Sequence, residues 1–554
     1  MHHGRTPEAI LITGGRVFLD GHIQEEPVAL VDGRVAAIGS DAVDALPARP
    51  TETIDAAGGL VSPGFQDSHI HPHHAGNTLI TCDLSDEDSI DGYLERISAY
   101  AAANPDRAWI TGGGWGMDLF PGGIPTKDLL DRVVPDRPVY LPNRDGHGAW
   151  VNSKALEIAG VTRDTIDPLS GRVERDADGD PVGCLQEGAM ELVSAHVPPL
   201  GDDDVDRGFL LAQEQLFAWG VTAWQDAMVE SGDRGLDNLA SYRRLDADGR
   251  LLARVVGAQW WEREKGLDQI EAFVANRDAV AGDRFSAGSV KIMQDGVAEN
   301  FTAAMLEPYL DGCGCSTSNA GKSFVDPGML TEASAALTAA GLRVHFHTLG
   351  DRAVREALDA IESTPGMRRP LLAHLQIIHP DDIARFAGLD AVASIQPLWA
   401  RHESQMDELT IPFLGARRAA WQYPFASLRR AGATLALGSD WPVSTANPLE
   451  IMHTAVTRCP PGRATDPLFG EQAISLSDAV VGYTAGSAYA NADEHRTGRI
   501  AVGYDADVTI LDRDIFSAPT AEIADASVAY TIVGGRVVFE TPSTGAGRPM
   551  EGRR

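Results

Sequence analysis

Cysteine and long apolar runs are scarce in this 554-residue sequence. The five cysteines are an odd set, and Cys313 and Cys315 lack the second pair that a zinc knuckle requires. We therefore predict reduced thiols without a disulfide framework, as in a cytoplasmic protein. No apolar run approaches the ~20 residues of a membrane span, and the opening segment MHHGRTPEAI has no cationic stretch followed by an apolar one.

Basic residues are the second deficit. The chain has 46 Lys and Arg against 79 Asp and Glu, which gives a formal net charge of -33. Nucleic acids and anionic membranes bind basic surfaces, so we expect neither as a partner. The composition, 44% hydrophobic and 23% charged, is that of a globular protein. A small-molecule substrate is the expected partner, and composition leaves a homodimer open.

Six side chains suited to metal binding or catalysis each end a short apolar run. They are His69, His71, Lys291, His347, His374 and Asp440. In a parallel barrel the C-terminal strand ends face one mouth, where the chemistry of that fold takes place. Four imidazoles, an amine and a carboxylate gathered there suit a divalent transition metal and the water that it activates. One histidine after an apolar run is usually an ordinary core or loop residue, but six positions in this order are hard to reach by accident.

The middle of the chain alternates between strand-like and helix-like segments. Residues 326–341 predict a helix with Asp326 as N-cap, Pro327 in the first turn and Gly341 as its end. Residues 351–363 predict the next helix. This rhythm predicts an α/β fold, a (β/α)8 TIM-like barrel, over residues 62–75 and 211–495.

Short alternating strands mark both ends of the chain. ILITGGRVFLDG near the start and YTIVGGRVVFET near the end share one pattern, and VALVDGRVAAIG predicts a hairpin with an Asp-Gly turn. Barrel caps are the alternative, but the matching phrases favour a small β-sandwich built from residues 1–61 and 496–554.

The spacing of strands breaks once. Between His71 and the next expected strand near Val221 lie roughly 150 residues, whereas ordinary βα loops have about 2–6. We predict an insertion or lid over residues 76–210, which leaves the barrel beside the metal site. The phrase RDGHGAWVN makes His147, with Trp115, an expected substrate contact. Asp295 in VKIMQDG is a third substrate candidate.

Several phrases carry a family resemblance: PGFQDSHIHP, GGGWGMDLFPGGIPT, VKIMQDGVAENFTAA, HTLGDRAV, GSDWPV and GYDADVTILD. Together with the ordered strand-end residues, they resemble the amidohydrolase superfamily of metal-dependent hydrolases. The wording is similar to its long-chain branch, which includes the N-substituted formamide deformylases. The resemblance runs from Ala9 to Val538, nearly the whole chain.

The resemblance implies a metal site with one or two Zn²⁺ ions, other divalent ions remaining open. His69 and His71 would hold the more buried ion, and Lys291 would become a carbamate that bridges two ions. His347 and His374 would hold the second ion, or one of them would face the substrate if a single ion binds. His345, two residues before His347, is a competing ligand, and Ala373 stands where the family often has an acidic residue.

The resemblance also implies roles in catalysis. Asp440 would bind metal and act as the general base. His374 or His147 would help the metal to stabilise the oxyanion. The predicted reaction is hydrolysis of a C–N bond in a non-peptide amide, such as an N-formyl or N-acyl amine.

Two other functions stay open at this point. Deamination or ring opening of a heterocycle would use the same residues. A barrel that binds metal but has lost catalysis would be a regulatory protein of another class. The presence of Asp440 argues against that reading, because metal binding alone could survive without a base.

Overall fold

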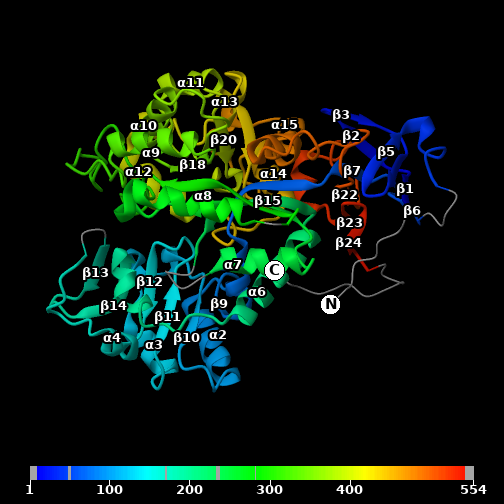
Figure 1. Cartoon of the computed structure of the whole chain (residues 1–554). Coiled ribbons are helices and arrows are strands. Elements are labelled where there is room, and N and C mark those ends of the chain that lie inside the picture. Colours follow the sequence, from blue (N-terminus) through cyan, green and yellow to red (C-terminus); the bar gives the residue numbers. More distant parts are fainter. Residues whose placement is uncertain (1–8, 48–51, 169–170, 232–236, 281, 543–554) are drawn as a thin grey trace.

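The computed structural model describes residues 9–47, 52–168, 171–231, 237–280 and 282–542. In this part of the chain a barrel adjoins both a pair of terminal β-sheets and a separate insertion (Figure 1). Residues 1–8 and 543–554, which the sequence assigns to the sandwich, lie outside the described residues, as do short stretches of the other two predicted ranges.

The barrel has eight parallel strands that pair in sequence order. They are β8 (Phe65–Ile70), β15 (Val221–Val229), β16 (Arg254–Trp260), β17 (Phe285–Met293), β18 (Arg343–Thr348), β19 (Leu371–His374), β20 (Val392–Ile395) and β21 (Thr434–Leu437). The first and last strands meet just beyond the end of β21. There Asp440 N donates to His69 O at 2.8 Å, and His71 N donates to Trp441 O at 2.9 Å. The predicted TIM-like barrel is confirmed.

Helices alternate with these strands along the chain. They are α6 (Asp202–Ala218), α7 (Asn238–Ala247), α8 (Ile270–Asp278), α9 (Pro327–Ala339), α10 (Asp351–Glu362), α11 (Ile383–Gly388), α12 (Ile411–Ala419), α13 (Phe425–Arg430), α14 (Pro448–Thr457), α15 (Leu476–Val481) and α16 (Ser487–Asn491). The Asp326 carboxylate caps α9 by accepting from the backbone of Gly328 and Met329, as its sequence predicts. Every helix in the described ranges is too short or too polar to cross a membrane.

Two β-sheets from the chain ends face each other and form the predicted sandwich. The four-stranded sheet has the order β5-β4-β1-β6 and the six-stranded sheet the order β24-β23-β22-β7-β2-β3. The strands are β1 (Ala9–Thr13), β2 (Arg16–Leu19), β3 (His22–Gln24), β4 (Val28–Val31), β5 (Arg34–Ile38), β6 (Glu52–Asp55), β7 (Leu60–Pro63), β22 (Val508–Leu511), β23 (Val528–Val533) and β24 (Arg536–Glu540). Buried side chains of both sheets, such as Ile12 and Val508, pack into one apolar core.

The repeated Gly-Gly-Arg-Val phrase has two different roles. Gly534 and Gly535, with φ of +55° and +75°, form the turn of the β23–β24 hairpin. The earlier copy carries the chain from β1 in one sheet to β2 in the other. Asp32 and Gly33 form the predicted Asp-Gly turn between β4 and β5, with φ of +49° and +76°.

The insertion between α1 (Pro72–Ile80) and α6 has its own six-stranded sheet of order β13-β14-β12-β11-β10-β9. Its elements are β9 (Cys82–Asp83), β10 (Ile110–Gly113), β11 (Val139–Pro142), β12 (Gly148–Val151), β13 (Gly171–Arg175), β14 (Pro181–Glu187), α2 (Ile90–Ala103), α3 (Lys127–Val133), α4 (Ser153–Ala159) and α5 (Glu191–Ser194). The helices α1 and α6 cross so closely that a Cβ atom on Gly76 would lie 2.3 Å from the carbonyl carbon of Gly208. This contact anchors both ends of the insertion beside the barrel mouth.

Candidate active site

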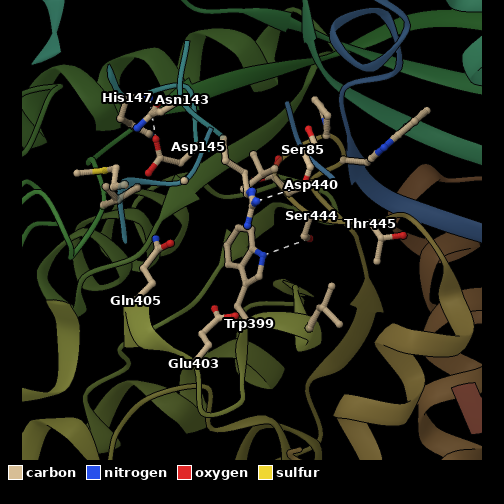
Figure 2. A pocket seen from close by; sticks show the side chains of 18 of the residues that line it. Ser85, Asn143, Asp145, His147, Trp399, Glu403, Gln405, Asp440, Ser444 and Thr445 are labelled. Atoms are coloured by element: carbon tan, nitrogen blue, oxygen red, sulfur yellow. Dashed lines mark hydrogen bonds between the residues drawn. The ribbon is translucent and has the colours of Figure 1, made fainter. Parts of the chain in front are cut away.

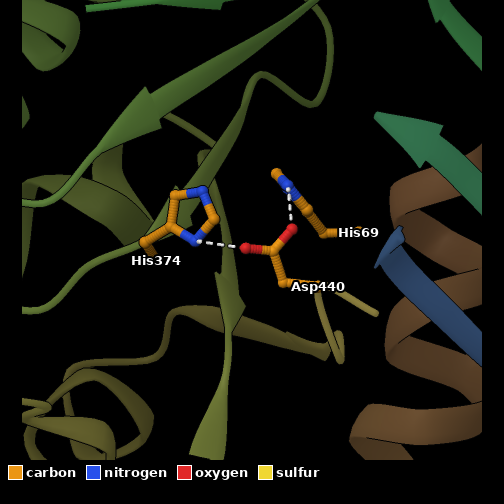
Figure 3. A group of neighbouring side chains, drawn as sticks. All are labelled: His69, His374 and Asp440. Carbon is orange, nitrogen blue, oxygen red and sulfur yellow. Dashed lines mark ion pairs between the residues drawn. The ribbon is translucent and has the colours of Figure 1, made fainter. Parts of the chain in front are cut away.

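The barrel strand ends bring the predicted metal-binding residues together. Nε2 of His71 and Nε2 of His69 lie 3.0 Å and 3.3 Å from Oδ1 of Asp440. Nδ1 of His374 lies 4.0 Å from Oδ2 of the same carboxylate (Figure 3). Lys291 Nζ lies 3.3 Å from His69 Nε2. Residues from three barrel strands (β8, β17 and β19), together with His71 just after β8 and Asp440 after β21, thus converge, with His347 of β18 adjoining them.

His347 adjoins this cluster and lies beside Asp295. Its ring centroid is 4.5 Å from that of His374, and its Nδ1 lies 3.3 Å from Asp295 Oδ1. The fully buried Asp295 carboxylate also accepts hydrogen bonds from the backbone N–H groups of Leu349 and Gly350. Asp295 does not border the cavity described below. Its oxygens already accept backbone hydrogen bonds, and a contact with substrate remains a prediction for this residue.

Burial keeps three of the clustered imidazoles uncharged. It lowers the pKa of His69, His347 and His374 well below the usual histidine value. A neutral imidazole retains one ring nitrogen with a lone pair, which is the form that binds a metal ion.

The carboxylate and the amine respond to burial differently. Burial alone would raise the pKa of Asp440, but its contact with His71 and the positive field of neighbours lower it below the ordinary value. Asp440 is therefore ionised at neutral pH. Burial lowers the pKa of Lys291 to about 7, so a substantial fraction of this amine is unprotonated there.

These residues fit a divalent metal ion. His374 Nδ1 and Asp440 Oδ1 are buried and have no hydrogen-bond partner in the described structure, which is costly unless another group satisfies them. Tetrahedral Zn²⁺ with ligands at 2.0–2.1 Å places neighbouring ligand atoms about 3.3 Å apart. The spacing of 3.3 Å between His69 Nε2 and Asp440 Oδ1 matches that distance.

A relay behind His69 fixes which of its nitrogens carries hydrogen. Gln225 Oε1 can only accept, so His345 Nδ1, 2.5 Å away, donates to it. His345 Nε2 then accepts from His69 Nδ1 at 2.9 Å. His69 Nε2 is left with its lone pair directed towards Asp440. His345, which the sequence leaves open as a ligand, is bonded at both ring nitrogens and orients the His69 ring.

The backbone at the site adopts conformations that the sequence does not reveal. His374, Leu375 and Asp440 have φ of +76°, +50° and +58°, a region that non-glycine residues enter at a cost. Hydrogen bonds hold two of these turns, from Leu375 N to Thr348 O at 2.9 Å and from Asp440 N to His69 O at 2.8 Å. The side chains of His374 and Asp440 therefore point in directions that an ordinary extended backbone would not give.

A buried carboxylate, that of Asp67, joins the first and last barrel strands. It accepts from His69 N at 3.0 Å and from Ser439 N at 3.1 Å. Burial raises its pKa to about 7, although these hydrogen bonds oppose the rise. Asp67 thus fixes the two segments that present His69 and Asp440.

A cavity of about 540 Å³ opens above the cluster and is lined by both the insertion and the barrel loops. Figure 2 shows Asp145 beside His147, with Trp399 and Asp440 bordering the same opening. The Trp399 ring stacks on His374 with centroids 5.5 Å apart, and its Nε1 donates to Ser444 Oγ at 3.2 Å. The volume is in the range of small-molecule sites.

Of the two insertion residues expected at the substrate, His147 lies in the cavity wall as a charged group. Burial alone would lower its pKa, but Glu187, whose Oε2 is 3.1 Å from Nδ1, raises it to about 9. The Trp115 indole is fully buried, and its Nε1 donates to Leu141 O at 2.8 Å, although the residue borders the cavity. Sequence reasoning missed Glu187 and Trp399, because neither lies near its partner along the chain.

A barrel that presents imidazoles and a carboxylate from its strand ends defines the class of metal-dependent hydrolases. The chain belongs to the amidohydrolase family, whose model matches residues 52–539. It is 30% identical to Protein LONG AFTER FAR-RED 3 of Arabidopsis thaliana over 96% of this chain and 91% of that protein. It is 27% identical to the N-substituted formamide deformylase of Arthrobacter pascens over 96% and 95%.

Solved structures agree with this assignment. The crystal structure of an uncharacterized metal-dependent hydrolase from Pyrococcus furiosus matches with a TM-score of 0.71 and 27% identity, covering 91% of this chain and 99% of that one. The predicted family resemblance is confirmed, and the protein is a metal-dependent amidohydrolase that acts on carbon–nitrogen bonds.

We predict that His345→Leu weakens Zn²⁺ binding about 10–100-fold, because His69 loses the acceptor that fixes its protonation. Competition with a chromogenic chelator measures the Kd, and thermal unfolding followed by circular dichroism checks the fold. His345→Gln, which can still accept from His69, should retain more affinity. His196→Leu changes an exposed histidine and serves as the control. A folded His345→Leu protein with unchanged Kd would contradict the relay.

Proposed function

We propose that the protein hydrolyses the C–N bond of a linear non-peptide amide, an N-formyl or N-acyl amine, with Zn²⁺ as its metal. The observation that carries the proposal is the ionised Asp440 carboxylate close to the neutral imidazoles of His69 and His374, beneath a cavity that His147 borders. The curated relative named N-substituted formamide deformylase supports this type of bond.

Six residues would hold one or two ions. They are His69, His71, Lys291, His347, His374 and Asp440. When bound, the metal supplies a Lewis acid that polarises the amide carbonyl and makes water acidic enough to attack at neutral pH.

Asp440 moves the proton in this mechanism. Its carboxylate accepts the proton of the attacking water and then delivers it to the leaving nitrogen, so that the C–N bond breaks to give an amine and a carboxylic acid. The lowered pKa of Asp440 keeps the base ionised before each turnover. The left-handed backbone at this residue directs the side chain towards the imidazoles of His69 and His71.

His147 stabilises the negative charge that develops on the carbonyl oxygen. Its imidazolium is held by Glu187 and adjoins His347, whose pKa its charge helps to lower. A charged donor in a cavity that excludes water acts more strongly than one in solvent.

We expect Asp440→Asn to lower kcat by about 10²–10⁴-fold, the usual cost of a lost general base, while losing less metal than rate. The assay follows amine release from N-formyl and N-acetyl alkylamines, and mass spectrometry of the eluted metal gives ions per chain. Asp381→Asn, at an exposed carboxylate, is the control. Near-normal turnover by Asp440→Asn would rule out this mechanism.

The charge of His147 predicts the alkaline side of the pH profile. Because its pKa is raised to about 9, kcat/KM should fall as the pH rises through 9 and the imidazolium loses its proton. His147→Gln keeps a donor that does not titrate, so it should lack this fall and lose about 1–3 kcal/mol of transition-state stabilisation at pH 7.5. The same alkaline limb in His147→Gln would exclude His147 as its source.

We also predict that Lys291 is carboxylated. Its unprotonated amine attacks carbon dioxide, a C–N bond forms and one proton leaves, giving a carbamate that can bind metal. Lys291→Ala should lose a metal ion per chain, and acetate or propionate should partly restore metal and activity. Lys154→Ala, at an exposed lysine, is the control. Unmodified lysine in a crystal structure with its full metal complement would reject the carbamate.

A further inference from the structure

We propose that the cavity selects amides that carry a second, protonated amino group, the class of N-acyl diamines. The inference rests on the proposed hydrolysis and names its substrate: the amide lies at the metal cluster and the ammonium lies beside Glu299. The evidence is an excess of carboxylates together with buried acceptors that lack donors.

Carboxylates outnumber basic groups around the cavity. Besides Asp440, seven Asp and Glu residues line it, against two guanidinium groups, those of Arg144 and Arg401. Arg401 donates to Glu403 at 3.2 Å, and Arg144 donates to a backbone oxygen. The imidazolium of His147, which also lines the cavity, is already paired with Glu187. Negative charge therefore remains on the wall after these pairs are counted.

Asp145 and Glu299 are the wall carboxylates on which this inference depends. Burial raises the pKa of Glu299, and the negative field of both carboxylates helps to raise the pKa of His147. The Glu299 carboxylate accepts from the Thr410 hydroxyl at 2.9 Å, and the Asp145 carboxylate accepts from the backbone N–H of His147 at 3.0 Å. No cationic side chain of the described residues forms an ion pair with either. Glu299 comes from the loop after β17, and Asp145 comes from the insertion, so the barrel side and the insertion side of the cavity wall each contribute a carboxylate.

Two buried side chains independently call for a hydrogen-bond donor from the cavity. Gln376 is 1% exposed, and its Nε2 donates to Gln422 Oε1 at 3.2 Å. Among the described residues, its Oε1 accepts no hydrogen bond. Tyr423 is 2% exposed, and its hydroxyl likewise has no partner among the described residues. The Tyr423 N–H donates to Gln376 O at 2.7 Å, which holds the two residues together in the wall. An ammonium group has three donors, which the Gln376 oxygen and the Tyr423 hydroxyl can both accept.

The position of these acceptors orients the substrate. Gln376 follows His374 by two residues, so the acceptors adjoin the hydrolytic cluster without belonging to it. A divalent metal repels an ammonium group, which places the charged end of the substrate towards Glu299 and the amide towards Asp440. The rings of Trp399 and Trp441 line the same cavity and offer faces that attract cations.

The test compares two amides of equal length on the full-length Zn²⁺-loaded protein. N-(4-aminobutyl)acetamide carries the ammonium group, and N-pentylacetamide has a methyl group in its place. We expect kcat/KM to be at least about tenfold higher for the cationic amide, mostly through KM, since the charge contributes to binding. Glu299→Gln should bring this ratio close to one. Glu332→Gln, at an exposed residue of α9 outside the cavity, should leave the ratio unchanged.

A second variant and a binding measurement keep the two proposals separate. Asp145→Asn should also lower the ratio if Glu299→Gln does not fold. Calorimetric titration compares the binding of both amides directly and does not depend on turnover. Hydrolysis of both amides with an equal or higher kcat/KM for the neutral one would overturn the cationic subsite and leave the hydrolase intact. Absence of hydrolysis with tighter, Glu299-dependent binding of the cation would instead reject the proposed reaction and support the subsite.

Discussion

The active site depends on the closure of the barrel between its first and last strands. The Asp67 carboxylate accepts backbone hydrogen bonds from His69 and Ser439, and Asp440 N donates to His69 O. These bonds join segments more than 350 residues apart in sequence and leave the Asp440 carboxylate 3.0 Å from His71. Without them, the imidazoles and the base would lie on separate strands with no fixed relation to each other.

Burial and pairing then give chemically similar groups different charges within one site. Burial keeps His347 neutral, whereas Glu187 keeps His147 protonated with a pKa near 9. Asp440 stays ionised because of its contact with His71, while burial of Asp295 raises its pKa to about 7 despite three backbone hydrogen bonds. A neutral imidazole, a charged imidazolium and an ionised carboxylate thus coexist in one site, because the neighbours of each group set its charge.

The sequence predicts those parts of the site that depend on local pattern. An apolar run followed by a polar residue predicts a strand end. This local pattern led to Lys291 and Asp440. The backbone amides that donate to the Asp295 carboxylate could not be foreseen, because Leu349 lies on another segment of the chain. The Glu187 partner of His147 and the left-handed backbone at His374 were likewise not foreseeable, since both arise from packing between distant elements.

The register of the insertion sheet links the recognition of substrate to the chemistry of the barrel. β12 and β14 pair so that Glu187 N donates to His147 O at 3.0 Å, and the same register sets the two side chains 3.1 Å apart. The charged donor is therefore built entirely within the insertion, as is Asp145, while every expected metal ligand belongs to the barrel. Changes in the insertion can alter which amide is held without moving the ligands. We infer that the barrel fixes the reaction and that the insertion, together with the loop of Glu299, decides which substrate reaches it.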